Sequence, residues 1–96
     1  MIESVARVAT ERPERYLRQL VDHLGHRLST GHLEDGRGEI IRDRARCTLE
    51  ATDGSLVLTA TGEDAEALRR IQDVVARHLE RFGGRESLQV QWSQPA

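Results

Sequence analysis

A long amphipathic helix is the feature that most limits the folds open to this chain. Residues 64–82 repeat apolar side chains at helical spacing, and steps of about 100° per residue gather Leu68, Ile71, Val75, His78, Leu79 and Phe82 in one sector. Charged residues fill the opposite side, so one face is predicted to pack on a core and the other to meet water. About nineteen residues at 1.5 Å each give a helix of roughly 28 Å, which needs a sheet beneath it.

The ends of this helix are marked by the residues around them. Thr61 is predicted to cap its start, with Asp64 in the matching position of a capping box. Gly83 is predicted to supply the left-handed residue that ends the helix. Two pairs of opposite charge have the i,i+4 spacing of ion pairs, namely Glu66 with Arg70 and Asp73 with Arg77.

A β-hairpin is predicted just before the helix. Asp53-Gly54 is a strong signal for a two-residue turn. Folding the chain about this turn sets small and apolar residues opposite one another on one face: Ala51 with Leu56, Leu49 with Leu58, and Cys47 with Ala60. A slip of one residue would turn Thr48 and Glu50 inward, so the hydrophobic pattern fixes the register.

The remaining segments complete an α+β fold. A second amphipathic helix is predicted over residues 13–28, with Pro13 in its first turn. Further strands are predicted over residues 4–9, 29–34, 38–42 and 88–92, the last from the alternation of Leu88, Val90 and Trp92 with glutamines. The order strand, helix, four strands, helix, strand predicts two helices packed on one face of a mainly antiparallel sheet.

Length and charge restrict the class of protein. The 96 residues predict one domain over residues 1–96, with a core over about 4–93 and a tail at 94–96. A net charge of −2 and few aromatic residues argue against nucleic acid or an anionic membrane as partner. The N-terminus lacks the apolar core of a signal peptide, so a cytoplasmic location is expected. Cys47 is the one cysteine, which excludes an internal disulfide and a cysteine-based zinc site.

Three pieces of the sequence carry a family resemblance. They are residues 16–20 followed by His23 and His26, residues 68–75 leading to 78–82, and Arg85-Glu86 followed by Leu88, Val90 and Trp92. In this order and spacing, residues 6–93 resemble the bacterial domain of unknown function numbered 2218. That family occurs alone and fused behind flavin-dependent siderophore-interacting proteins, which reduce ferric siderophores. The resemblance therefore implies, by association, a link to iron handling and a siderophore-reductase-type partner.

The chain also departs from the family pattern. The family usually has an aromatic pair with Pro and Gly where Ile41-Arg42-Asp43-Arg44 stands, and a further Phe where Gly83-Gly84 follows Phe82. It often has a Cys at the position of Val21. A pocket lined by those aromatics would be reshaped here, and we expect any pocket between the Gly83-Gly84 corner, residues 41–45 and Trp92.

Several polar residues have both a structural and a functional interpretation. His78 lies near the centre of the apolar stripe, either as a core residue held by one hydrogen bond or as a ligand or proton-handling group. Arg81 and Arg85 flank the glycine turn, where they either pair with Glu86 or bind an anion.

The other histidines and arginines leave similar alternatives. His23 and His26 are spaced i,i+3, either as a solvated pair or, with His32 or His78, as a site for zinc, copper or iron. A row of Arg42, Arg44 and Arg46 is either a solvated face or a contact for an acidic partner or an anionic siderophore. Cys47 is expected to be a small buried residue.

The sequence contains no nucleophile motif and no cofactor fingerprint. It predicts a non-enzymatic accessory or binding module without a cofactor, whose candidate ligand-binding residues are His78, Arg81, Arg85 and Trp92. The alternative is a histidine-based metal- or haem-binding protein that uses His23 and His26. A small enzyme using His78 with a nearby carboxylate is ranked last. A homodimer through the outer face of the sheet, where Val57 lies beside threonines and glutamines, is the expected assembly.

Overall fold

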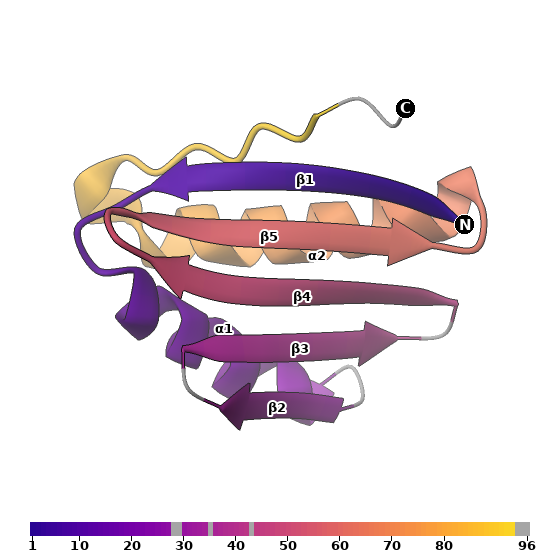
Figure 1. Cartoon of the computed structure of the whole chain (residues 1–96), viewed down its shortest axis with the longest axis horizontal. Coiled ribbons are helices and arrows are strands. Elements are labelled where there is room, and N and C mark those ends of the chain that lie inside the picture. Colours follow the sequence, from indigo (N-terminus) through magenta and orange to yellow (C-terminus); the bar gives the residue numbers. More distant parts are fainter. Residues whose placement is uncertain (28–29, 35, 43, 94–96) are drawn as a thin grey trace.

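The predicted hairpin forms two inner strands of an antiparallel sheet. The computed structural model describes residues 1–27, 30–34, 36–42 and 44–93, without the side chains of residues 25–27, 30–34 and 85. The elements are β1 (Ile2–Ala9), α1 (Pro13–Arg27), β2 (Thr30–Glu34), β3 (Arg37–Arg42), β4 (Ala45–Thr52), β5 (Ser55–Gly62), α2 (Ala65–Phe82) and a short 3₁₀ helix, η1 (Gly84–Glu86). The sheet order is β1-β5-β4-β3-β2, and both helices lie on one face of it (Figure 1). The α+β class is therefore confirmed.

The hairpin has the register that the sequence predicts. Ala51 pairs with Leu56, Leu49 with Leu58 and Cys47 with Ala60. Gly54 has φ 76°, a left-handed value that glycine adopts at no steric cost. The strand predicted over residues 4–9 is also confirmed, because β1 pairs along its whole length with β5.

Apolar side chains from both helices and the sheet form the core between these two layers. The fully buried members include Leu17, Leu20 and Leu24 of α1, Ile71, Val75 and Leu79 of α2, and Cys47, Leu49, Leu56 and Leu58 of the hairpin. Burying one such aliphatic side chain contributes about 1.5–3 kcal/mol. The apolar stripes of the two helices are thus what hold them on the sheet.

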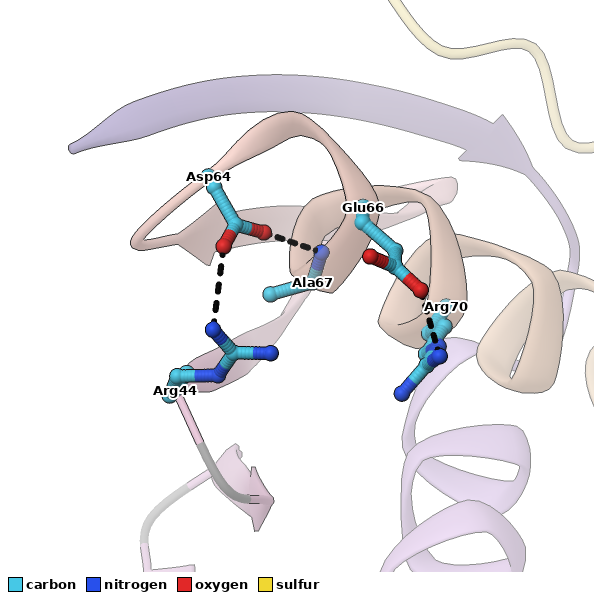
Figure 2. Close-up of polar contacts among 5 residues, drawn as sticks. All are labelled: Arg44, Asp64, Glu66, Ala67 and Arg70. Atoms are coloured by element: carbon cyan, nitrogen blue, oxygen red, sulfur yellow. Dashed lines mark hydrogen bonds and ion pairs between the residues drawn. The ribbon is translucent and has the colours of Figure 1, made fainter.

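Asp64, rather than Thr61, caps the start of α2. Asp64 has an extended backbone, and its Oδ1 accepts a hydrogen bond of 2.8 Å from the Ala67 backbone N–H. Its other oxygen accepts from the Arg44 guanidinium at 3.1 Å (Figure 2). The prediction of Thr61 was wrong because β5 continues to Gly62, which keeps Thr61 in the sheet.

The two predicted ion pairs on α2 are confirmed. Glu66 pairs with Arg70 (Figure 2), and Asp73 pairs with Arg77 at 2.7 Å. All four side chains are well exposed, so each pair is expected to contribute no more than about 0.5 kcal/mol.

The strand predicted over residues 88–92 is wrong. In the described part of the chain, residues 88–93 have no regular secondary structure, although they run beside β1 (Figure 1). The Val90 N–H donates to a Glu80 carboxylate oxygen at 3.1 Å, and the Val5 N–H is satisfied by the Ser93 hydroxyl at 3.0 Å. The alternation in the sequence reflects one-sided packing, since Leu88 is buried and Val90 and Trp92 pack against the core. The predicted tail at 94–96 lies outside the described residues.

Candidate functional site

The start of α1 and the end of α2 meet at one end of the sheet. An open groove of about 600 Å³ lies between them and η1, and we call it the corner groove. Its lining residues are Glu11, Arg12, Arg15, Tyr16, Gln19, Arg81, Phe82, Gly84 and Glu86.

Glu86 connects η1 to the segment between β1 and α1. One carboxylate oxygen accepts a hydrogen bond of 2.6 Å from the Tyr16 hydroxyl, and the other accepts from the Glu11 backbone N–H at 3.1 Å. The Thr10 hydroxyl donates to the same carboxylate at 3.0 Å and itself accepts from the Arg12 N–H at 3.1 Å. These contacts hold one wall of the corner groove in place, although Tyr16 and Glu86 are 70 residues apart in the sequence.

The same contacts set the protonation states of Glu86 and Tyr16. The hydrogen bond from Tyr16, followed by the one from the Glu11 N–H, lowers the pKa of Glu86 below its ordinary value. The hydrogen bond to Glu86 raises the pKa of Tyr16, and burial adds to this shift. Near neutral pH, Glu86 is therefore an ionised acceptor and Tyr16 a protonated donor.

Three arginines surround the corner groove. Arg12, Arg15 and Arg81 are exposed and line it. Among the described side chains, none of the three belongs to an ion pair. The neighbouring Glu86 carboxylate already accepts hydrogen bonds from uncharged donors. The three guanidinium groups are therefore exposed donors around the groove, and the charge of Arg12 also helps to lower the pKa of Glu86.

The structure places the predicted ligand-binding residues in different parts of the fold. Arg81 lines the corner groove, whereas Trp92 packs against the core from the segment beside β1. The side chain of Arg85 lies outside the described part of the structure. His78 is half-buried and does not line the groove, and its Nδ1 donates to the Val74 carbonyl at 2.8 Å.

In the described part of the chain, the glycine corner and the residues around Ala45, between which a pocket was expected, lie at opposite ends of α2. Ala45 pairs with Gly62, just before the start of α2, whereas Gly83 follows the end of α2. The length of this helix therefore separates the two segments (Figure 1). A long packed helix excludes the expected juxtaposition.

His78 instead contacts His23 across the two helices. Their ring centroids are 4.9 Å apart, and Phe82 lies 5.6 Å from His23 in an edge-on arrangement. Such aromatic pairs add about 0.5–1.5 kcal/mol beyond the area they bury. The contact joins α1 to α2 beside the core.

The described side chains contain no group of three or more His, Cys, Asp or Glu placed to hold a metal ion. His26, the other predicted metal ligand, has a side chain outside the described part. Because Nδ1 of His78 donates to a carbonyl, only its Nε2 is left as a ligand. Burial raises the pKa of the Cys47 thiol to about 12, so this residue is an inert part of the core as predicted.

The predicted row of arginines does not lie on one strand: Arg42 ends β3, Arg44 lies in the turn that follows, and Arg46 lies on β4. Arg44 pairs with Asp64 at 3.1 Å, and Arg46 pairs with Glu39 at 3.4 Å. Sequence reasoning missed Arg12, Arg15 and the Tyr16–Glu86 contact. Nothing local signals that contact, since only the fold brings its partners together.

Comparisons with known proteins agree with this fold. The model of a family described as "Uncharacterized protein conserved in bacteria (DUF2218)" matches residues 5–93. The NMR structure of PA4090 from Pseudomonas aeruginosa is 33% identical, with a TM-score of 0.81 over 97% of this chain and 96% of that chain. No curated protein matches the sequence. Within the described residues, neither helix is long and apolar enough to span a bilayer.

Proposed function

This chain belongs to the bacterial DUF2218 family, and we propose that it is a binding module that takes a small anionic ligand into the corner groove. The observation that supports this most directly is a set of exposed arginines around the groove, none of which forms an ion pair with a described side chain: Arg12, Arg15 and Arg81. A guanidinium group presents paired N–H donors that match the two oxygens of a carboxylate or phosphate.

The rest of the corner groove suits a compact ligand. A Cβ built on Gly84 would meet no atom within 4 Å, so this position leaves the rim open. Phe82 supplies an apolar wall beside the arginines. Because Tyr16 and Glu86 hold each other at 2.6 Å, the wall between them is fixed before a ligand arrives. Such preorganisation lowers the entropic cost of binding.

An anionic iron chelate and a free polycarboxylate both have this chemistry. The family's association with siderophore reduction favours the chelate, and a siderophore-reductase-type protein is then the partner that would exchange it. The alternative of a metal- or haem-binding protein stays a prediction. Elemental analysis of the purified chain, and of a His23→Ala/His26→Ala variant, tests that alternative.

Isothermal titration calorimetry with citrate and with gallium(III) citrate, a redox-inert substitute for the ferric chelate, tests the proposal. Losing one charge-assisted contact, at about 1.5–3 kcal/mol, should weaken binding roughly ten- to a hundred-fold in Arg81→Gln. Arg69→Gln is the matched control, since Arg69 is exposed on the same helix but does not line the groove.

The outcomes distinguish an iron chelate from a free polycarboxylate as the ligand. Tighter binding of gallium citrate favours a chelate, and equal binding favours a free carboxylate. Absence of binding at millimolar concentration, or equal weakening in both variants, would refute an anion site in the corner groove.

A further inference from the structure

No helix or strand of the described residues covers the face of the sheet opposite the two helices. Strands β1, β5, β4 and β3 present it toward the viewer in Figure 1, with both helices behind. We call this surface the outer face, and its residues are Glu3, Val5, Arg7, Arg37, Glu39, Ile41, Arg46, Thr48, Glu50, Val57, Thr59 and Thr61.

Strand pairing arranges these residues in three rows across the sheet. The first row is Arg7, Val57, Glu50 and Arg37; the second is Val5, Thr59, Thr48 and Glu39; the third is Glu3, Thr61, Arg46 and Ile41. Charges thus concentrate in the two outer rows, and on β1 and β4 the sign in the first row is opposite to the sign in the third.

This pattern is self-complementary, and we propose that the outer face binds a second copy of this chain. A twofold axis lying along the second row exchanges the first and third rows. Arg7 then faces Glu3 of the second copy, and Glu50 faces Arg46 of the second copy. Val5, Thr59 and Thr48 meet their own counterparts, which gives a centre without charge on these three strands.

An axis along the strands, also in the plane of the sheet, gives a poorer match. An axis parallel to the strands, between β5 and β4, would place Arg7 against Arg37 of the second copy. It would also place Val57 against a glutamate. Like-charge contacts disfavour an association strongly, so the charge pattern selects the axis across the strands.

Glu39 is the one charged residue on the second row, where it would approach its own counterpart. Its side chain is only 29% exposed, and Arg46 lies 3.4 Å from it in the same chain. That arginine offsets the repulsion. A shallow hollow of about 620 Å³ beside it, lined in part by Thr48, Val57 and Thr59, gives room for side chains of the second copy.

The size of the outer face limits the expected affinity of the dimer. Four strands about 4.8 Å apart and about five residues long cover roughly 19 by 17 Å. This is roughly 320 Å² on each copy, well below the roughly 800 Å² per partner of a standard specific interface. A weak, transient dimer is therefore expected, with a dissociation constant in the high micromolar range or above.

Sedimentation equilibrium over a range of concentrations, with charge reversal and rescue, tests the dimer. Arg7→Glu should weaken dimerisation at least ten-fold, because it faces Glu3 of the second copy. Glu3→Arg combined with Arg7→Glu should restore the dissociation constant to within about three-fold. The two residues are four positions apart on one strand, about 13 Å, so rescue requires contact between chains.

Arg18→Glu is the matched control, since Arg18 is exposed on α1, and it should leave the dissociation constant unchanged. Near-ultraviolet circular dichroism verifies that each variant is folded. A monomer at millimolar concentration, an Arg7→Glu variant that dimerises normally, or a double variant without rescue would overturn the proposal.

Discussion

Replacing Gly83 by alanine tests how the chain turns after α2. Glycine commonly follows a helix because it adopts a left-handed conformation. Gly83 does not, since its φ is −93°. A Cβ at this position would instead lie 2.2 Å from Cδ1 and 2.5 Å from Cγ of Leu88. The close approach of Leu88, rather than backbone freedom, is therefore the reason for glycine here.

The structure also indicates the size of the effect. Leu88 is 7% exposed and belongs to the core, so an alanine must push this side chain out or distort the turn. Overpacking costs about 1–3 kcal/mol. At about 2 kcal/mol, Tm would fall by about 8–16 °C in a domain of this size.

Urea and thermal unfolding followed by circular dichroism measure the difference. Gly84→Ala is the matched control: no atom lies within 4 Å of its added Cβ, and its φ is not positive. Its effect should lie between none and about 1 kcal/mol of stabilisation.

A second comparison isolates the clash. Leu88→Ala removes the obstructing atoms, so adding Gly83→Ala to it should cost much less than Gly83→Ala alone. The reasoning would be refuted if the Gly83→Ala variant were as stable as the wild type. It would also be refuted if the losses in unfolding free energy from the two substitutions were fully additive.

Three further expectations follow from other contacts. Removing the phenol donor in Tyr16→Phe should raise the pKa of Glu86, which ¹³C NMR of its carboxyl carbon measures; an unchanged pKa would contradict the assigned hydrogen bond. Because the pKa of Glu86 is lowered on folding, its contribution is present above the unfolded pKa and lost as pH falls through the folded pKa, so acid unfolding should need less acid in Tyr16→Phe. Asp64→Ala should cost about 1 kcal/mol as a lost helix cap, against at most about 0.5 kcal/mol for the exposed Asp73→Ala, and equal losses in urea unfolding would contradict the cap at Ala67. Cys47, with a pKa of about 12, should react with a thiol reagent at pH 8 only as fast as the chain unfolds, and rapid labelling of the native chain would contradict its burial.

Local sequence patterns predicted much of the fold. Helical periodicity located both helices, because every third or fourth residue must meet the core whatever lies beneath it. The hairpin register followed from Asp53-Gly54 and the alternation around it, since a slip would bury Glu50. These features depend on neighbours a few residues apart, and the structure has them as predicted.

Features that depend on residues far apart in the sequence were harder to predict. Leu88, Val90 and Trp92 alternate like a strand because they pack on one side, yet the sequence does not say where their backbone hydrogen bonds go. The cap of α2 depended on where β5 ends, and that end is set by pairing with β1 and β4. Alternation reports burial, whereas a strand also needs a ladder of hydrogen bonds.

The candidate site shows the same division. The sequence alone determined the class of the fold, the two amphipathic helices and the presence of arginines near the end of α2. Only the tertiary structure decided that Tyr16 and Glu86 meet at 2.6 Å and that Arg12 and Arg15 line the same groove as Arg81. The physical reason is that the corner groove is built from two helix ends, which become neighbours only once both apolar stripes are buried against the same sheet.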